Sequence, residues 1–273
     1  MRQDGVLSVI KRVGQVLCVS MLLSVGSETV SFAHPDLVDP EVNAARVAIL
    51  KTFPGAIIQN WQPAPIPSMY MFTLNQDDRV FFVDQSGQYL LAQAALFDMK
   101  SQKNLTQDFI LGKRREVLAS MSLERAVVYA PSTADTASST RTLYVFDDPD
   151  CPYCRELHPE LKQLVASGVT VAVFLHPVER IHKGATQKSV NIWCSANRTE
   201  SLDLALTGKA VPDVAKPCET PIEQNLTLAR QLGGGPTPYI VFPDGRSIAG
   251  KKSAQELMSM LGMAPTLAQQ LTQ

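Results

Sequence analysis

Apolar residues along the chain follow two patterns, one before about residue 98 and one after it. In the first part, residues 40–53 have apolar positions at partly helical spacing, and the Pro-Gly pair that follows ends the predicted helix. Three runs rich in aromatic and β-branched residues come next, separated by polar turns: 69–74, 79–84 and 88–94. The pattern therefore predicts a small α+β unit over residues 34–98, close to the lower size limit for an independent core.

The second part begins with a helical pattern and then alternates between strand and helix patterns. Residues 104–121 predict a linker helix within residues 99–122. Short apolar runs then predict strands at 124–131, 141–147, 169–175 and 238–242, the last of them opening a hairpin. Amphipathic segments predict helices at 155–168, 185–196, 199–207, 220–232 and 253–262. The strand–helix–strand order predicts a right-handed parallel unit within one α/β domain over residues 123–273.

The first 33 residues have the features of a secretory signal. Positive charge precedes a short apolar run at 13–25, and Ser31 and Ala33 place small residues where a signal peptidase cleaves. An uncleaved membrane anchor is the alternative, but a run of about 13 residues is shorter than the roughly 18 needed to span a bilayer. We therefore expect residues 1–33 to be a signal peptide, cleaved before His34, and the rest of the chain to be exported.

Composition and charge narrow the class of protein. The chain is 45% hydrophobic and 19% charged, which is typical of a soluble globular protein with a substantial core. Its formal net charge is −1, and no basic stripe stands out along the sequence. A nucleic-acid partner is therefore not indicated.

Export to an oxidising compartment changes the chemistry that we expect of the cysteines. One of the five lies in the predicted signal, which leaves four in the mature chain: Cys151, Cys154, Cys194 and Cys218. An even number of cysteines in an oxidising compartment points to disulfides. Four cysteines allow three pairings, and sequence alone does not choose among them. The close spacing of Cys151 and Cys154 nevertheless sets these two apart from the others.

Cys151 follows a predicted strand and immediately precedes a predicted helix. If that helix begins at Pro152, a residue well suited to the first helical position, Cys151 lies at its N-terminus. Backbone N–H groups and the helix dipole there favour the thiolate and lower the thiol pKa. The acidic residues of "DDPDC" (147–151) oppose this effect, and we expect the helix terminus to outweigh them.

The CPYC spacing predicts a redox centre. Cys151 would attack a substrate disulfide, and Cys154, about one turn further into the helix, would resolve the mixed disulfide. Half of a zinc site is an alternative, but a second pair of ligands at similarly tight spacing is missing. A purely structural Cys151–Cys154 bond is another, although it would close a very small loop. His158, one turn beyond Cys154, is expected to be an exposed helix residue.

Thr237-Pro238 in "GGGPTPYIVF" (233–242) is the second candidate feature of the site. A cis proline facing a CxxC helix would present the backbone of the preceding residue to a substrate, and cis bonds occur almost only before proline. A Thr-Pro pair is common by itself, but together with CPYC it is a specific signal. Tyr153 is expected to flank the substrate groove or, alternatively, only to fill the turn between the cysteines.

Several segments together resemble the DsbC/DsbG family of periplasmic disulfide isomerases, a branch of the thioredoxin superfamily. The segments that carry the resemblance are "QNWQPAPIPSMYMFTLN", "VFFVDQSGQYLLAQAALFDM", "VFDDPDCPYCRELHPEL", "IWCSANR" with "KPCE", and "GGGPTPYIVFPDGR". The first two are similar to the family's N-terminal dimerisation domain, and the others to its thioredoxin-like α/β catalytic domain with a helical insertion. The segment "HPVERIHKGATQKS" (176–189) departs from the family's pattern.

The resemblance implies a function and a set of partners. The protein would be a periplasmic homodimer that reshuffles or reduces non-native disulfides in misoxidised exported proteins, without a metal or organic cofactor. A membrane thiol reductase of the DsbD type would donate its electrons. Cys194 and Cys218 match the family's second cysteine pair and would form a structural disulfide, which on the chain-entropy model contributes roughly 3 kcal/mol for a loop of ~25 residues; free buried thiols are the alternative.

Three other functions stay open at this point. CPYC mildly favours a DsbG-like reductase of sulfenylated single cysteines. A holdase chaperone, in which the cleft matters more than the sulfur chemistry, is a non-enzymatic alternative. A DsbA-like oxidase is disfavoured by the N-terminal domain.

Overall fold

The structure is a computed structural model that describes residues 40–131, 141–216 and 218–263, with the backbone alone at 40–43. The predicted signal at 1–33 and the polar stretch at 132–140 lie outside the described residues. Within the described ranges, every helix is too short or too polar to cross a bilayer. The domain boundaries expected at residues 33, 98 and 122 stay a prediction.

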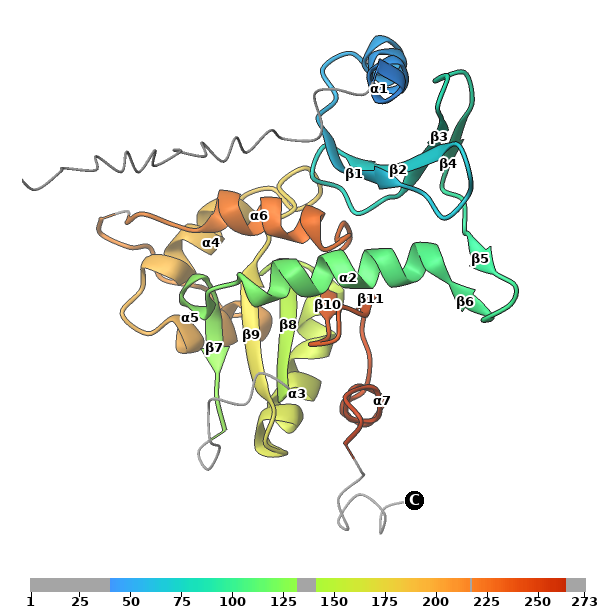
Figure 1. Ribbon diagram of the computed structural model, residues 1–273. Coiled ribbons are helices and arrows are strands. Elements are labelled where there is room, and N and C mark those ends of the chain that lie inside the picture. Colours follow the sequence, from blue (N-terminus) through green and yellow to red (C-terminus); the bar gives the residue numbers. More distant parts are fainter. Residues whose placement is uncertain (1–39, 132–140, 217, 264–273) are drawn as a thin grey trace, which may run out of the picture. The chain divides into compact units, whose positions relative to one another are not determined.

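The N-terminal part is one helix on a four-stranded antiparallel sheet (Figure 1). Its elements are α1 (Pro40–Thr52), β1 (Ile58–Pro63), β2 (Met69–Leu74), β3 (Phe81–Asp84) and β4 (Leu90–Ala92), with the strands in the order β1-β2-β3-β4. Ala45 and Ile49 of α1 are buried against Phe72 of β2. Gly87 lies so close to α1 that a Cβ there would stand 2.7 Å from the Cβ of Ala48, and its φ of +73° also favours glycine. The predicted helix and meander are therefore confirmed.

A short ribbon and a helix follow. The ribbon pairs β5 (Phe97–Asp98) with β6 (Lys103–Asn104), and the sequence did not predict it because two-residue strands carry no periodicity. The predicted linker helix is present as α2 (Leu105–Ala119). Asn104 caps it by accepting a 2.9 Å hydrogen bond from the backbone N–H of Gln107.

The remaining strands form a five-stranded mixed sheet. They are β7 (Val127–Tyr129), β8 (Thr142–Asp147), β9 (Thr170–Leu175), β10 (Tyr239–Val241) and β11 (Ser247–Ala249), in the order β11-β10-β8-β9-β7, with the 3-10 helix η2 (Leu123–Arg125) before β7. β8 and β9 are parallel, as predicted, whereas the other neighbours are antiparallel. Every residue of β8 and β9 is buried, which explains their uninterrupted apolar runs.

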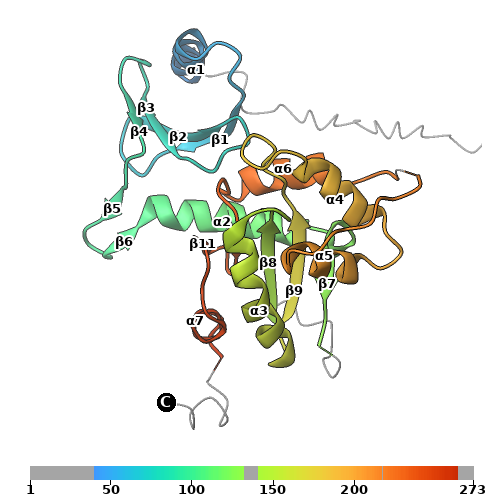
Figure 2. The same ribbon diagram turned by 180° about the vertical axis from the view of Figure 1, so that it is seen from behind.

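Helices cover both faces of this sheet. The remaining helices are α3 (Pro152–Ala166), α4 (Ala185–Cys194), α5 (Arg198–Leu206), α6 (Ile222–Gln231) and α7 (Ala254–Met260). Figure 1 shows α2 and α6 on one face, and the reverse view in Figure 2 shows α3 on the other. Alternate residues of β8 divide accordingly: Val145 packs in the cluster with Leu157 of α3, and Phe146 in the cluster with Leu228 of α6. This arrangement places the N-terminus of α3 just beyond the end of β8.

Candidate active site

The two cysteines of CPYC lie at the start of α3. Cys151 is the N-cap residue and Pro152 the first helical residue, so the condition that places Cys151 at the helix N-terminus is met, although the apolar pattern predicted the helix only from residue 155. Cys154 lies within the first turn. Both are free thiols, and their relative exposures are 4% for Cys151 and 0% for Cys154. The helix start therefore holds one thiol at its boundary and one inside the core.

The loop before β10 lies against Cys151. The Cys151 thiol donates a 3.3 Å hydrogen bond to the backbone carbonyl of Thr237, across 86 positions of sequence. The Thr237–Pro238 peptide bond is cis. The structure thus brings together Cys151, Thr237 and Pro238 among the residues singled out from the sequence.

The pKa of Cys151 is lowered to about 5. The largest cause is a hydrogen bond from the Cys154 side chain, which stabilises the thiolate. Burial opposes the shift, while Thr237 and the backbone N–H groups of Cys154 and Tyr153 lower the pKa further. At neutral pH Cys151 is therefore a thiolate, the form that attacks disulfides.

Cys154 has the opposite electrostatic environment. Burial is the largest cause that raises its pKa, and the neighbouring Cys151 and Asp147 raise it further. Removing its proton would create a second negative charge in a dry site that already contains two acidic groups. Cys154 therefore stays protonated and donates its hydrogen bond to Cys151.

Asp147 is a functional candidate that the sequence reasoning did not single out. It ends β8 and is fully buried, and apart from its interaction with the Cys154 thiol neither of its carboxylate oxygens has a hydrogen-bond partner among the described residues. Burial raises the pKa of Asp147 to about 7; interaction with the Cys154 thiol lowers it, and charge on Cys151 and Asp148 raises it. Burying a carboxyl group with so few polar partners lowers the free energy of unfolding. The available sequence signal was a carboxylate at the end of a strand that is otherwise almost wholly apolar.

Asp148 joins the segment before Cys151 to the segment after β9. It is fully buried and accepts hydrogen bonds from the backbone N–H of Asp150 at 2.8 Å and of Val178 at 2.6 Å. Nδ1 of His182 lies 2.9 Å from the same carboxylate. Asp148 therefore holds the loop before α3 against the segment that follows β9.

Asp150 forms ion pairs on both sides. Lys188 of α4 contacts its carboxylate, and Nη2 of Arg155 lies 3.2 Å from Oδ1. Two cations therefore offset the negative charge next to Cys151. This pairing explains why the acidic stretch does not prevent a lowered thiol pKa.

A cavity of about 380 Å³ opens beside Cys151. It is lined by Cys151, Pro152, Tyr153, Val178, Arg180, Ile181, His182, Gly235, Pro236 and Thr237. Tyr153 lies at its edge and is 60% exposed, so it flanks the cavity rather than filling the core.

His158 is buried, which corrects the expectation of an exposed residue. It is only 5% exposed, and its Nε2 lies 3.0 Å from Oδ1 of Asp203 in α5. The same carboxylate accepts a 2.8 Å hydrogen bond from the hydroxyl of Tyr129. It also accepts a 2.8 Å hydrogen bond from Nζ of Lys162. The expectation was wrong because α5 covers this side of α3, and the pattern of α3 alone does not show a covering helix.

Cys194 and Cys218 form a disulfide with an S–S distance of 2.06 Å. The bond joins the last residue of α4 to the segment before α6. The indole N–H of Trp193 donates a 3.2 Å hydrogen bond to the carbonyl of Glu219 beside it. Within the described ranges, no group of three or more His, Cys, Asp or Glu side chains could hold a metal ion.

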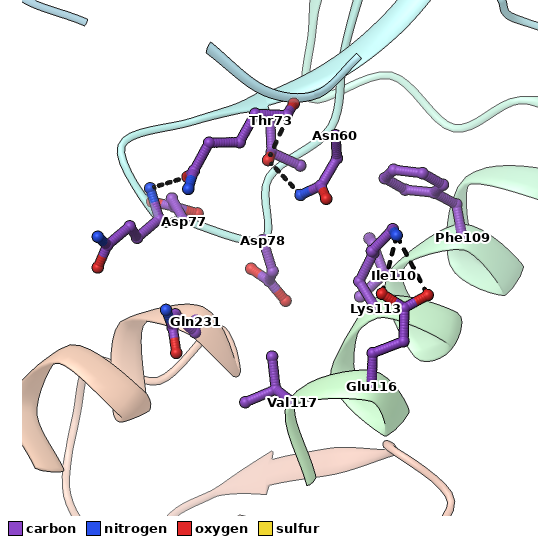
Figure 3. Close-up of a pocket in the computed structure, with 12 residues that line it drawn as sticks. Asn60, Thr73, Asp77, Asp78, Phe109, Ile110, Lys113, Glu116, Val117 and Gln231 are labelled. Atoms are coloured by element: carbon purple, nitrogen blue, oxygen red, sulfur yellow. Dashed lines mark hydrogen bonds and ion pairs between the residues drawn. The ribbon is translucent and has the colours of Figure 1, made fainter. Parts of the chain in front are cut away.

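A second cavity, of about 180 Å³, lies between strand residues near the N-terminus and helix α2 (Figure 3). Several of its polar side chains are paired with each other. Asn60 donates a 2.9 Å hydrogen bond to Thr73, and Lys113 contacts Glu116 at 2.9 Å. Neither cysteine nor histidine is among its described lining residues. We therefore assign it no chemistry.

Comparison with known proteins finds family models and relatives that agree with one another. Residues 33–107 match the disulfide bond isomerase protein N-terminal domain, and residues 130–264 match the thioredoxin-like domain. The thiol:disulfide interchange protein DsbC of Dickeya dadantii is 30% identical over 217 residues, covering 78% of this chain and 85% of that protein. Its namesake from Salmonella typhimurium is 26% identical over 221 residues, covering 80% and 88%. DsbC of Escherichia coli K12 is 26% identical over 202 residues, covering 73% and 79%.

These relatives confirm the fold class expected from the sequence, an α+β N-terminal domain followed by a thioredoxin-like α/β domain. They also confirm the expected enzyme class, a thiol–disulfide oxidoreductase. The chain therefore belongs to the DsbC family of thiol:disulfide interchange proteins.

Proposed function

We propose that Cys151 is the nucleophile and Cys154 the resolving thiol in exchange with disulfides of exported proteins. One observation carries this proposal: the two thiols interact directly, yet the pKa of Cys151 is lowered and that of Cys154 is raised. The thiol at the cavity is thereby ionised, and the thiol behind it keeps its proton until it is needed.

In the first step, the Cys151 thiolate attacks one sulfur of a client disulfide. The client S–S bond breaks, a mixed disulfide forms on Cys151, and the other client sulfur leaves as a thiolate. The Cys151 sulfur lies 3.3 Å from the carbonyl oxygen of Thr237, which places this reaction beside the backbone of the cis-proline loop. The client chain would lie along that loop.

The mixed disulfide can then be resolved in two ways. A client thiolate can attack it, which forms a new client disulfide and returns the Cys151 thiolate; this is isomerisation. Alternatively, Cys154 loses its proton and attacks the Cys151 sulfur. The client then leaves as a reduced thiolate, and a Cys151–Cys154 disulfide forms.

Asp147 is suited to accept the Cys154 proton in the second route. Its carboxylate interacts with that thiol, and a pKa of about 7 allows it to take up a proton and release it again near neutral pH. The released client thiolate can then be protonated from the same group or from water. The enzyme returns to its dithiol state with two electrons from a donor, for which we propose a membrane thiol reductase.

Trapping tests the assignment of the two thiols. In a Cys154→Ala variant, mixed disulfides with scrambled ribonuclease should accumulate, because the intramolecular resolving step is lost. In a Cys151→Ser variant they should be absent. Non-reducing gel electrophoresis followed by mass spectrometry measures both. Adducts on Cys154 rather than Cys151, or none on either, would overturn the proposal.

We also propose that the protein works in the periplasm as a homodimer joined through its N-terminal part. The sequence features of a signal and the N-terminal family match support this. The edge strand β4 and the residue before it carry exposed apolar side chains: Tyr89 is 66% and Leu91 45% exposed. An edge strand with such side chains is suited to pairing with a second copy.

Sedimentation velocity of the mature chain tests the dimer. We expect a dimer at micromolar concentration and a monomer in a Tyr89→Lys, Leu91→Lys variant, because charge on an edge strand opposes pairing. Leu123→Lys, at an exposed apolar residue elsewhere, should leave the dimer unchanged. A monomeric parent chain, or a variant that remains dimeric, would contradict this interface.

A further inference from the structure

The segment of residues 177–184, between β9 and α4, forms one wall of the cavity beside Cys151. Val178, Arg180, Ile181 and His182 of this segment line it, opposite residues of the α3 start and of the cis-proline loop. The exchange chemistry assigned to Cys151 and Cys154 uses none of this segment's side chains.

The wall is held in place by hydrogen bonds at both ends. At its start, the buried carboxylate of Asp148 accepts the N–H of Val178 and contacts His182. At its end, the carboxylate of Glu179 accepts the N–H groups of Gly184 at 2.8 Å and Thr186 at 2.9 Å. A surface fixed in this way binds without first having to be ordered.

The chemistry of the cavity is apolar with one positive edge. Tyr153 and Ile181 both line it, and each is 60% exposed. Such large exposed apolar side chains beside a reactive group mark an interaction surface. Arg180 also lines the cavity, and it makes no ion pair within the described part of the chain. His182 is already paired with Asp148.

The reacting sulfur determines what occupies this cavity. Cys151 is itself a lining residue, so a client cysteine bonded to it places its neighbouring residues between the wall and the start of α3. We propose that the segment 177–184 selects clients. Ile181 and Tyr153 hold an apolar side chain next to the client cysteine, and Arg180 favours a carboxylate close by. This inference rests on the proposed role of Cys151.

Symmetric peptide disulfides test the selection, because either sulfur then presents the same neighbours. The first pair has Phe or Ser on both sides of the cysteine, and the second pair has Asp or Lys two residues away on both sides. Rates of reduction by the full mature chain are measured at low salt. We expect Phe peptides to react about 10-fold faster than Ser peptides, and Asp peptides several-fold faster than Lys peptides.

Two variants assign the preferences to the wall. Ile181→Ser should reduce the Phe preference to about twofold, since most of the apolar contact is lost. Arg180→Glu should reverse the Asp preference, and added salt should weaken the preference in both proteins. Ile57→Ser and Lys209→Glu, at exposed positions outside the cavity, are the matched controls and should change neither preference.

A small neutral disulfide separates this inference from the function on which it rests. Bis(2-hydroxyethyl) disulfide has no side chain for the wall and no charge for Arg180, so Ile181→Ser and Arg180→Glu should reduce it as fast as the parent, within about twofold. If the parent does not reduce it, the role of Cys151 fails. If the parent reduces it but shows no peptide preference, or keeps its preference in both variants, only the selection by this wall is overturned.

Discussion

Cys151 opens onto a cavity of about 380 Å³, whereas Cys154, one helical turn away, is fully buried beside the carboxyl group of Asp147. The first backbone N–H groups of the helix lower the pKa of Cys151 and not that of Cys154, but they are among the smaller causes of the difference. The largest cause that lowers the pKa of Cys151 is the hydrogen bond from Cys154. That bond exists only while Cys154 keeps its proton, which burial and Asp147 ensure. We call the surroundings of Cys151 at the cavity the open region, and those of Cys154 and Asp147 the closed region. Cys151 in the open region is therefore reactive because Cys154 in the closed region keeps its proton.

Alkylation at different pH values gives the largest test of this contrast. At pH 7, iodoacetamide should modify Cys151 more than about 10³-fold faster than Cys154, because only Cys151 is a thiolate there. The rate at Cys151 should be half-maximal near pH 5, where its pKa lies. Peptide mapping by mass spectrometry measures both rates on the reduced protein.

A Cys154→Ala variant refines that test. Losing the hydrogen-bond donor should move the half-maximal pH of Cys151 upward by about one to two units, while the helix terminus and Thr237 keep it below the value of free cysteine. An unchanged profile would show that the closed region does not control the open one. A parent profile centred near pH 8.5 would contradict the lowered pKa itself.

Asp147→Asn removes the proton acceptor from the closed region. Resolution of a trapped client by Cys154 should slow by about 10- to 100-fold, the usual size of a general-base effect. Formation of the mixed disulfide by Cys151 should change much less. Quenched-flow measurement of the two steps separates them, and in the Cys154→Ala background the substitution should have no further effect on client release. Equal slowing of both steps would contradict this role.

The same variant should alter stability with a defined sign. The pKa of Asp147 is raised in the folded protein, so the folded state binds the proton more tightly than the unfolded state does. Its contribution to the free energy of unfolding is favourable below about pH 4 and is lost as the pH rises through about 7. Asn cannot ionise, so relative to the parent it should gain about 2–4 kcal/mol between pH 4 and pH 8. Urea unfolding at several pH values measures this difference, and a constant difference would contradict the buried charge.

The open region was partly predictable from the sequence. CPYC after an apolar run placed Cys151 at a helix start, and Pro152 is the first residue of α3. Thr237-Pro238 was predicted as a loop that faces the cysteines, and the Cys151 thiol does donate to the Thr237 carbonyl. These features depend on local backbone preferences, which short motifs record.

The closed region and the wall of the cavity were not predictable in this way. Asp147, Asp148 and Asp150 look alike in sequence, yet they differ in the structure. Among the described residues, Asp147 interacts with the Cys154 thiol alone, Asp148 fixes two loops, and Asp150 is ion-paired. What separates them is where the chain after β9 returns, across 30 residues to Val178 and 38 to Lys188. Burial of His158 likewise depends on the packing of α5. Contacts at this separation leave no periodic signal.

Lys188→Gln gives the smallest and most local test. Lys188 and Arg155 both pair with Asp150, which directly precedes Cys151. Removing one cation leaves the Asp150 carboxylate less neutralised, so the pKa of Cys151 should rise by about 0.3–0.5 units, as expected for a partly screened charge. The pH profile of alkylation measures the shift. An Asp150→Asn, Lys188→Gln double variant removes both charges and should restore the parent profile. A rise that persists in the double variant would mean that Lys188 acts on Cys151 by another route, and the pairing with Asp150 would no longer explain why an acidic stretch accompanies an ionised thiol.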